Sequence, residues 1–187
     1  TTGTQTYSGA VTITGTAATR TLTNTSSAIT FSSTVDSTAS AANSLTFGAG
    51  TGTATFTGAV GGASNGALGT ITNASGQTLI FSDAVSATTI ANYGTLLFNA
   101  ASAKTIGPAI TDNGTTTVQV INASNSVAPG VITFSGNVAA DTITIGNTTY
   151  AGSALFNGTV SGTNINIVGG DHASEASLGK FANTVSV

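Results

Sequence analysis

Two carboxylates in the second half of the chain have a spacing that suits a shared site. Asp112 and Asp141 follow the aromatic position of a repeating motif by six and seven residues, in neighbouring repeats. We therefore expect both side chains at the same turn, about one strand spacing apart. Such a pair can bind Ca²⁺ or act as the two acids of a glycosidase, or it can be two solvent-exposed turn residues. The sequence predicts no other cofactor.

The only histidine lies in a short polar segment near the end of the chain. His172 follows Asp171 and precedes Ser174 and Glu175. A catalytic triad needs a nucleophile, a base and an orienting carboxylate within mutual reach, and consecutive turn residues rarely provide that geometry. Weak metal binding by Asp171, His172 and Glu175 is the second interpretation. We predict a solvated loop here, and a chain that is not an enzyme.

The composition excludes several classes of partner. Only 5% of the residues are charged, the net charge is −3, and Lys and Arg together number three. A surface with so few cations does not bind phosphates, so we expect no nucleic-acid partner. No apolar run reaches the length of a membrane-spanning helix, and we expect no membrane insertion of this segment.

The absence of Cys and Met bears on origin. Because Met is missing even at position 1, we expect either a mature product or a fragment of a longer surface protein. A Cys-free chain rich in Ser, Thr, Asn and Gly is typical of a bacterial or archaeal exterior. The predicted location is therefore extracellular, at the cell surface, after export.

The chain is organised by a repeat of about 25 residues, in which an aromatic residue is followed by valine four positions later. The interval between successive aromatic positions stays close to this length. These positions are Tyr7, Phe31, Phe56, Phe81, Ile106 as a weaker copy, Phe134, Phe156 and Phe181. The valine positions are Val11, Val35, Val60, Val85, Ile110, Val138, Val160 and Val185. Such a period indicates a repeat architecture.

A second ladder has the same period but another phase: Asn24, Gly48, Asn73, Asn99, Asn122, Asn147 and Gly170. Short β-branched segments precede these turn residues, and no segment has a helical pattern. Residues 1–187 are therefore predicted to form a single all-β domain, a parallel β-helix of about seven coils of ~25 residues. The alternative is an antiparallel β-sandwich. Pro108 and the longer interval after Ile106 predict a bulge or loop between residues 108 and 130.

Pairs of threonines two residues apart resemble the flat face of ice-binding solenoids. They occur at Thr12/Thr14, Thr53/Thr55 and Thr142/Thr144. Their distances from the aromatic position differ, so we expect them not to stack into one array. Strand propensity explains them equally well.

The repeats resemble those of known surface proteins. Residues 3–13 are similar to repeats of filamentous-haemagglutinin-like proteins, and residues 132–138 resemble autotransporter passenger repeats. This resemblance covers most of the chain and rests on repeat style. It implies a right-handed parallel β-helix that is exported to the cell surface and has a structural or adhesive role.

Two functions remain, and they differ in their partner. The first is an extracellular structural protein that self-assembles end to end into a fibre, sheath or layer. The second is an adhesin passenger module that binds a host or neighbouring-cell ligand. An adhesin needs an exposed apolar patch, whereas nearly every Phe here is assigned to the core, so we favour assembly.

We expect the assembly interface at the two ends of the solenoid. Residues 181–187 are interpreted as the first strand of an eighth coil, whose edge no proline or charge cluster protects. In this interpretation two first strands compete for one level at the junction. The predicted interface residues are Phe181, Asn183, Val185 and Val187 at one end, and Tyr7, Val11 and Ile13 at the other.

Overall fold

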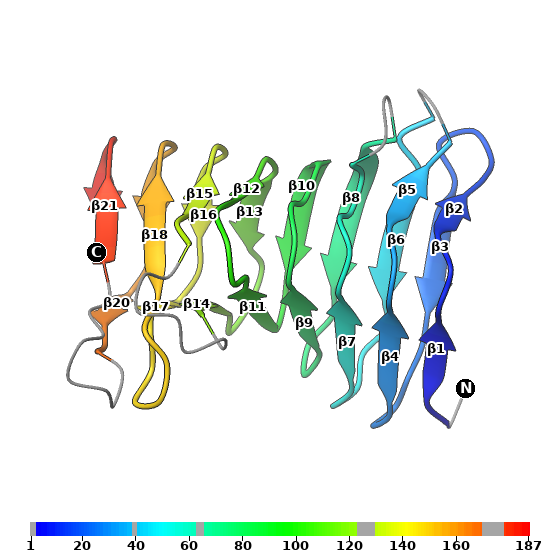
Figure 1. Ribbon diagram of the computed structural model, residues 1–187, viewed down its shortest axis with the longest axis horizontal. Helices are drawn as coiled ribbons and strands as arrows, with labels where there is room; N and C mark the ends of the chain where they lie inside the picture. The colour runs from blue at the N-terminus through cyan, green and yellow to red at the C-terminus, as the bar shows by residue number, and fades with distance from the viewer. Residues whose placement is uncertain (1–2, 39–40, 63–65, 123–129, 170–177) are drawn as a thin grey trace.

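The computed structural model describes residues 3–38, 41–62, 66–122, 130–169 and 178–187. These residues form strands and turns and contain no helix. The strand pairs among them are parallel. Successive coils lie side by side along the long axis, and the two termini lie at opposite ends (Figure 1). The chain is therefore a parallel β-solenoid, as predicted, and the antiparallel alternative is wrong.

Each coil has three faces, and two of them are continuous eight-stranded sheets. Face A consists of β1 (Gln5–Tyr7), β4 (Ala28–Phe31), β7 (Thr53–Phe56), β9 (Thr78–Phe81), β11 (Thr95–Asn99), β14 (Thr117–Ile121), β17 (Thr142–Ile145) and β20 (Asn164–Ile167). Face C consists of β3 (Thr19–Leu22), β6 (Ser44–Phe47), β8 (Leu68–Asn73), β10 (Ala87–Asn92), β13 (Ala109–Asp112), β16 (Val138–Ala139), β19 (Val160–Ser161) and β22 (Val185–Ser186).

Face B lies between the other two and is narrower. Its strands are β2 (Val11–Ile13), β5 (Val35–Ser37), β12 (Lys104–Ile106), β15 (Ile132–Phe134), β18 (Ser153–Phe156) and β21 (Leu178–Phe181). Single bridges through Val60 and Val85 connect β5 to β12, so this face also continues through all eight levels.

Four columns of residues, each with one residue per coil, run through the core. Because side chains alternate along a strand, every second residue points inward. Columns 1 and 2 come from face A, column 3 from face B and column 4 from face C. Column 1 is Gln5, Ile29, Ala54, Leu79, Leu96, Val118, Ile143 and Ile165. Column 2 is Tyr7, Phe31, Phe56, Phe81, Phe98, Val120, Ile145 and Ile167. Column 3 is Val11, Val35, Val60, Val85, Ile106, Phe134, Phe156 and Phe181. Column 4 is Arg20, Leu45, Ile71, Ile90, Ile110, Val138, Val160 and Val185.

One aromatic ring per coil forms an unbroken stack through the core, which we call the aromatic stack. Its members are Tyr7, Phe31, Phe56, Phe81, Phe98, Phe134, Phe156 and Phe181, with neighbouring ring centroids 4.9 to 5.5 Å apart. The assignment of Phe56, Phe81 and Phe156 to the core is confirmed, and each stacks on a ring of a neighbouring coil. Phe47 meets Phe56 edge to face at 5.7 Å, but their strands belong to different sheets.

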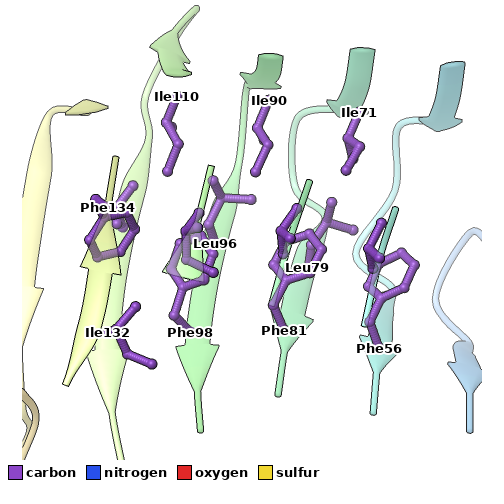
Figure 2. Packing of buried hydrophobic residues seen from close by; sticks show 14 of the residues in the cluster. Phe56, Ile71, Leu79, Phe81, Ile90, Leu96, Phe98, Ile110, Ile132 and Phe134 are labelled. Carbon is purple, nitrogen blue, oxygen red and sulfur yellow. The ribbon is translucent and has the colours of Figure 1, made fainter. Parts of the chain in front are cut away.

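The aromatic stack changes face in the middle of the solenoid. Phe98 lies on face A and Phe134 on face B, and their rings are at 89° to one another, whereas the other pairs in the stack are nearly parallel. Figure 2 shows this step next to the row formed by Ile71, Ile90 and Ile110. The sequence-based alignment of Ile106 with Phe81 is therefore wrong, because Phe98 pairs with Phe81 and Ile106 bridges Val85.

A short fourth coil causes this change of face. Phe98 follows Phe81 much sooner along the chain than Phe56 follows Phe31, although the two residues of each pair are direct neighbours on face A. The four-residue step from aromatic to valine is a tight corner that links face A to face B in the first four coils. From the fifth coil onward the same corner links face B to face C, as from Phe134 to Val138. Pro108 lies in such a corner, between β12 and β13, and does not interrupt pairing.

The second sequence ladder changes corner at the same point. Asn24, Gly48 and Asn73 follow or end strands of face C, whereas Asn99, Asn122 and Asn147 end or follow strands of face A. Asn73 is followed in its own column by Asn92 instead of Asn99. A ladder with one period predicts stacking in one column, and this prediction is wrong for the second ladder.

Candidate functional site

The corner that joins face C to face A, called here the C–A corner, contains hydrogen-bonded buried amides. Asn73 Nδ2 donates to Asn92 Oδ1 at 2.8 Å and to the Thr95 carbonyl at 3.0 Å. Asn92 Oδ1 also accepts the Gly94 N–H at 3.2 Å. Because a buried polar group without a partner costs about 1–3 kcal/mol, these bonds hold successive C–A corners in register.

The predicted carboxylate pair lies further along the same corner. Asp112 pairs with Asn92 in the sheet, and its Oδ1 accepts the Thr116 hydroxyl at 2.9 Å and the Gly114 N–H at 3.2 Å. Asp141 Oδ2 accepts the Thr116 N–H at 3.0 Å, and the Asp141 N–H donates to the Thr116 hydroxyl at 3.2 Å. Both carboxylates therefore contact Thr116, which is 2% exposed.

These hydrogen bonds account for the conformation of the C–A corner without a bound ion. One oxygen of each carboxylate is used in hydrogen bonds to the local chain, and Asp112 itself is exposed. The remaining oxygens, Asp112 Oδ2 and Asp141 Oδ1, are ligands of the kind that Ca²⁺ prefers, but Ca²⁺ takes about six to eight oxygens. Water would have to supply most of them. A Ca²⁺ site at Asp112 and Asp141 remains a prediction.

Calcium binding has a direct thermal test. If the two carboxylates bind Ca²⁺ in the folded chain only, millimolar Ca²⁺ should raise the melting temperature. The Asp112→Asn variant should lose this increase, and Mg²⁺ serves as the control cation because it prefers a stricter octahedral geometry. An unchanged melting temperature in Ca²⁺ would reduce the pair to turn residues that bind Thr116.

The segment around His172 lies outside the described residues, as do Asp171, Ser174 and Glu175. Its predicted solvated loop therefore remains a prediction. Among the residues that the structure does describe, no three His, Cys, Asp or Glu side chains lie together as a metal site.

An ion pair lies where the solenoid changes face. Lys104 Nζ is 2.7 Å from Asp83 Oδ1, which also accepts the Ala84 N–H at 2.7 Å. Asp83 is in the tight corner of the fourth coil, and Lys104 begins β12 in the fifth. Partial burial raises the pKa of Asp83, but the Lys104 hydrogen bond and charge and the Ala84 N–H outweigh it, so the pKa lies below its ordinary value.

This ion pair predicts a specific pH dependence of stability. Because the folded pKa of Asp83 is depressed, its stabilising contribution is complete above the unfolded value of 3.8 and is lost as pH falls through the folded pKa. Replacing Lys104 with methionine should lower the free energy of unfolding near neutral pH, and the difference from wild type should shrink below pH 3.8. Acid-unfolding curves of both chains measure this, and a difference that is constant with pH would contradict the assignment.

The last coil exposes apolar side chains at an unpaired edge. β20, β21 and β22 are terminal strands, with neighbours on one side only within the described chain. Ile167 is 53% exposed, Val185 39% and Val187 80%. Phe181 is half-buried and stacks on Phe156 at 5.2 Å. This edge has the features of a surface that pairs with another strand.

An open cavity of about 250 Å³ lies at the opposite end, at the first coil. Its lining is mainly apolar and consists of Tyr7, Val11, Thr12, Ile13, Thr14, Arg20, Leu22, Phe31, Val35 and Leu45. The cavity therefore reaches past the first coil to residues of the second.

Polar groups make the first coil different from the last. Arg20 occupies column 4, where the next coil has Leu45, and its guanidinium donates to the Thr14 carbonyl at 2.8 Å. Gln5 occupies column 1, and its Oε1 accepts the Tyr7 hydroxyl at 3.1 Å. A charged side chain on an edge strand disfavours pairing with another strand, and Arg20 is exposed on β3 at this end.

The seven predicted interface residues fall in the first and last coils. Tyr7 and Val11 are half-buried, Ile13 is 6% exposed, and Asn183 is exposed in the last tight corner. Phe181 belongs to face B and Val185 to face C. The expected role of residues 181–187 as the first strand of an eighth coil is wrong, because β20 on face A already begins that coil.

Threonines do stack on the outer side of face A. Thr53, Thr78, Thr95, Thr117 and Thr142 pair in register on successive coils, so the expectation of different positions is wrong for Thr53/Thr55 and Thr142/Thr144. It holds for Thr12, which pairs with Asp36 on face B. The neighbouring outer position has Ile80, Leu97 and Gln119 on three consecutive coils. The array is thus one residue wide there, which does not favour an ice-binding face.

Sequence reasoning missed the residues that complete these sites. Thr116 joins the two carboxylates, and its position four residues after Asp112 was the available signal. Composition identifies Arg20 only as one of three cations, although it lies one repeat length before Leu45 and thus in the phase of a core column.

Comparison of the chain with protein-family models, curated proteins and solved structures gave no match. The described residues include no helix that is long and apolar enough to cross a membrane.

Proposed function

We propose that the protein is an extracellular structural protein whose copies associate end to end into a fibre, sheath or layer. The observation that carries this proposal is the eighth coil, where Ile167, Val185 and Val187 are exposed beside unpaired strand edges. Strand addition to such an edge supplies main-chain hydrogen bonds and removes apolar surface from water.

The opposite end supports this proposal. The cavity at the first coil is lined by Val11, Ile13 and Leu22, which belong to strands β2 and β3 of that coil. When the apolar end of one copy meets the apolar cavity of the next copy, two different surfaces are in contact, so the contact is heterologous. Such contacts produce open filaments when no rotation closes them into a ring.

The alternative is an adhesin module that binds a cell-surface ligand. Seven of the eight Phe residues are buried and Phe181 is half-buried, so the aromatic residues that often anchor a ligand are used in the core. Tyr93, 40% exposed, is the large aromatic that projects furthest among the described residues. We therefore favour assembly, and we propose an extracellular location from the Ser-, Thr-, Asn- and Gly-rich composition.

Assembly is tested by a matched pair of charged variants. Purified protein should form elongated particles at rising concentration, seen by electron microscopy and by sedimentation. Val185→Asp places a charge in column 4 at the open edge and should abolish these particles. Ser186→Asp adds the same charge on the adjacent residue of the same strand, which points outward, and should retain them.

A truncation complements these variants. Deleting residues 181–187 removes β22 and the end of β21, and should abolish assembly while the circular dichroism spectrum of the remaining coils is retained. If the full chain stays monomeric at high concentration, or if Val185→Asp assembles as well as Ser186→Asp, the assembly proposal is wrong.

A further inference from the structure

One side-chain amide at the C–A corner makes a hydrogen bond that skips a coil. Gln77 lies in the corner that follows β8 and is 1% exposed. Its Nε2 donates to the Asn24 carbonyl at 3.0 Å, in the corner that follows β3. The bond therefore connects the third coil to the first and passes the second, whereas the repeats of a solenoid ordinarily contact their immediate neighbours.

The second corner, between β6 and β7, has glycines that leave space for this bond. They are Gly48, Gly50 and Gly52. A Cβ at Gly50 would be 2.9 Å from Gln77 Nε2 and 2.6 Å from the Asn24 carbonyl oxygen, both too short for a real contact. A Cβ at Gly52 would overlap the side-chain amide of Asn24. A side chain at Gly50 would therefore occupy the space that the Gln77 amide uses.

Both ends of the bond are held in place by their own corners. Asn24 is fully buried, and its Nδ2 donates to the Ser27 carbonyl. The Gln77 N–H donates to the Ala74 carbonyl at 3.2 Å, and the Gln77 carbonyl accepts the Thr95 N–H at 3.0 Å. Main-chain atoms thus close the turn at Gln77, and the turn itself does not need the side-chain amide. That amide is used between coils.

We propose that Gln77 is a strap that couples the first coil directly to the third, so that the first three coils open as one unit. Opening of the first or the third coil alone would leave a buried amide donor and a buried carbonyl without partners, which is unfavourable. Local opening is the route by which a folded chain exposes its backbone below the free energy of global unfolding. The strap closes this route for single coils, and it acts within one molecule, independently of assembly.

Main-chain amides at the corner between faces A and B report on this coupling. The Ser32 N–H and the Thr57 N–H each donate at 2.9 Å to the carbonyl of the aromatic residue one coil earlier. They link the second coil to the first and the third coil to the second, at the end of face A away from the Gln77 corner. The Asn157 N–H makes the same kind of bond at 2.9 Å between the sixth and seventh coils.

Native-state hydrogen exchange of the Gln77→Met variant tests the strap. Methionine has a similar length and shape but no N–H donor. We expect exchange at Ser32 and Thr57 to accelerate together by about tenfold, because the bond is lost and a buried carbonyl is left unpaired. Exchange at Asn157 should stay unchanged.

Gln119→Met is the matched control. Gln119 Nε2 donates to the Gly146 carbonyl at 3.4 Å, which is one coil away. The same substitution at this position should leave exchange at Ser32 and Thr57 unchanged. Gln77→Asn is a second test variant, because it retains the amide but is one methylene shorter and cannot reach Asn24, so it should reproduce the effect of Gln77→Met.

Three outcomes would overturn the strap. The first is faster exchange only at amides beside Gln77, such as Thr78 and Thr95, which would make its role local to the turn. The second is an equal acceleration at Asn157, which would indicate a loss of global stability without coupling of particular coils. The third is unchanged exchange at Ser32 in both Gln77 variants.

Discussion

Replacing Phe81 with alanine should lower the free energy of unfolding by about 3–5 kcal/mol. Phe81 is 1% exposed and lies between Phe56 at 5.0 Å and Phe98 at 5.5 Å in the aromatic stack. The substitution removes buried apolar surface and two ring contacts, and it leaves a cavity at a fully enclosed position. Because each coil packs its core only on its neighbours, the loss cannot be spread over a wider core.

Denaturant unfolding of the wild type and variant measures this effect. Tyr93→Ala is the matched control, because it removes an aromatic ring that is 40% exposed and outside the stack, and it should change stability by less than about 0.5 kcal/mol. Similar losses for the two substitutions would contradict the role of the aromatic stack as the main packing element.

Replacing Gly61 with alanine should destabilise the fold by about 3 kcal/mol or more, through backbone strain and steric overlap together. Gly61 has a φ of +67°, where a side chain is strained. A Cβ at this position would overlap the Ser86 carbonyl oxygen on the next coil. The Gly61 N–H also donates to the Val35 carbonyl at 2.8 Å, so the residue is held between two coils and cannot move away.

The control for this prediction is Gly9→Ala. Gly9 has no atom within 4 Å of an added Cβ and no positive φ, so its substitution should be nearly neutral. Melting temperatures of the two variants provide the comparison. A Gly61→Ala chain as stable as Gly9→Ala would mean that the two coils are free to separate at this corner.

The sequence predicts the coil correctly but not the face on which each strand lies. Within the first four coils the spacing of Tyr7, Phe31, Phe56 and Phe81 predicts their column, because each interval holds one full coil. The motif of an aromatic followed by valine encodes a tight corner. The apolar side chains on both sides of that corner are buried whichever two faces the corner joins. Hydrophobic pattern therefore cannot distinguish the corner between faces A and B from the one between B and C.

Phe98 was the available signal for the change of face. It follows Phe81 too soon for a full repeat, and a fixed period therefore assigns it to a second type of strand. The carboxylate pair was predicted more successfully, since Asp112 and Asp141 both reach Thr116. Their partners depend on how two coils stack, which the spacing of one coil does not specify.

The change of face restricts how the length of this protein can vary by recombination. Unequal crossing-over between repeats of the first half, such as those starting at Phe31 and Phe56, adds or deletes a whole coil and leaves each strand on its face. Crossing-over between Phe81 and Phe134 would join a strand of face A, which ends at Phe81, to the corner after Phe134. In the present chain that corner leads from face B to face C. The short link from Val138 to Ile145 would then have to cross two faces. Gain and loss of coils should therefore be tolerated within each half and selected against between the halves.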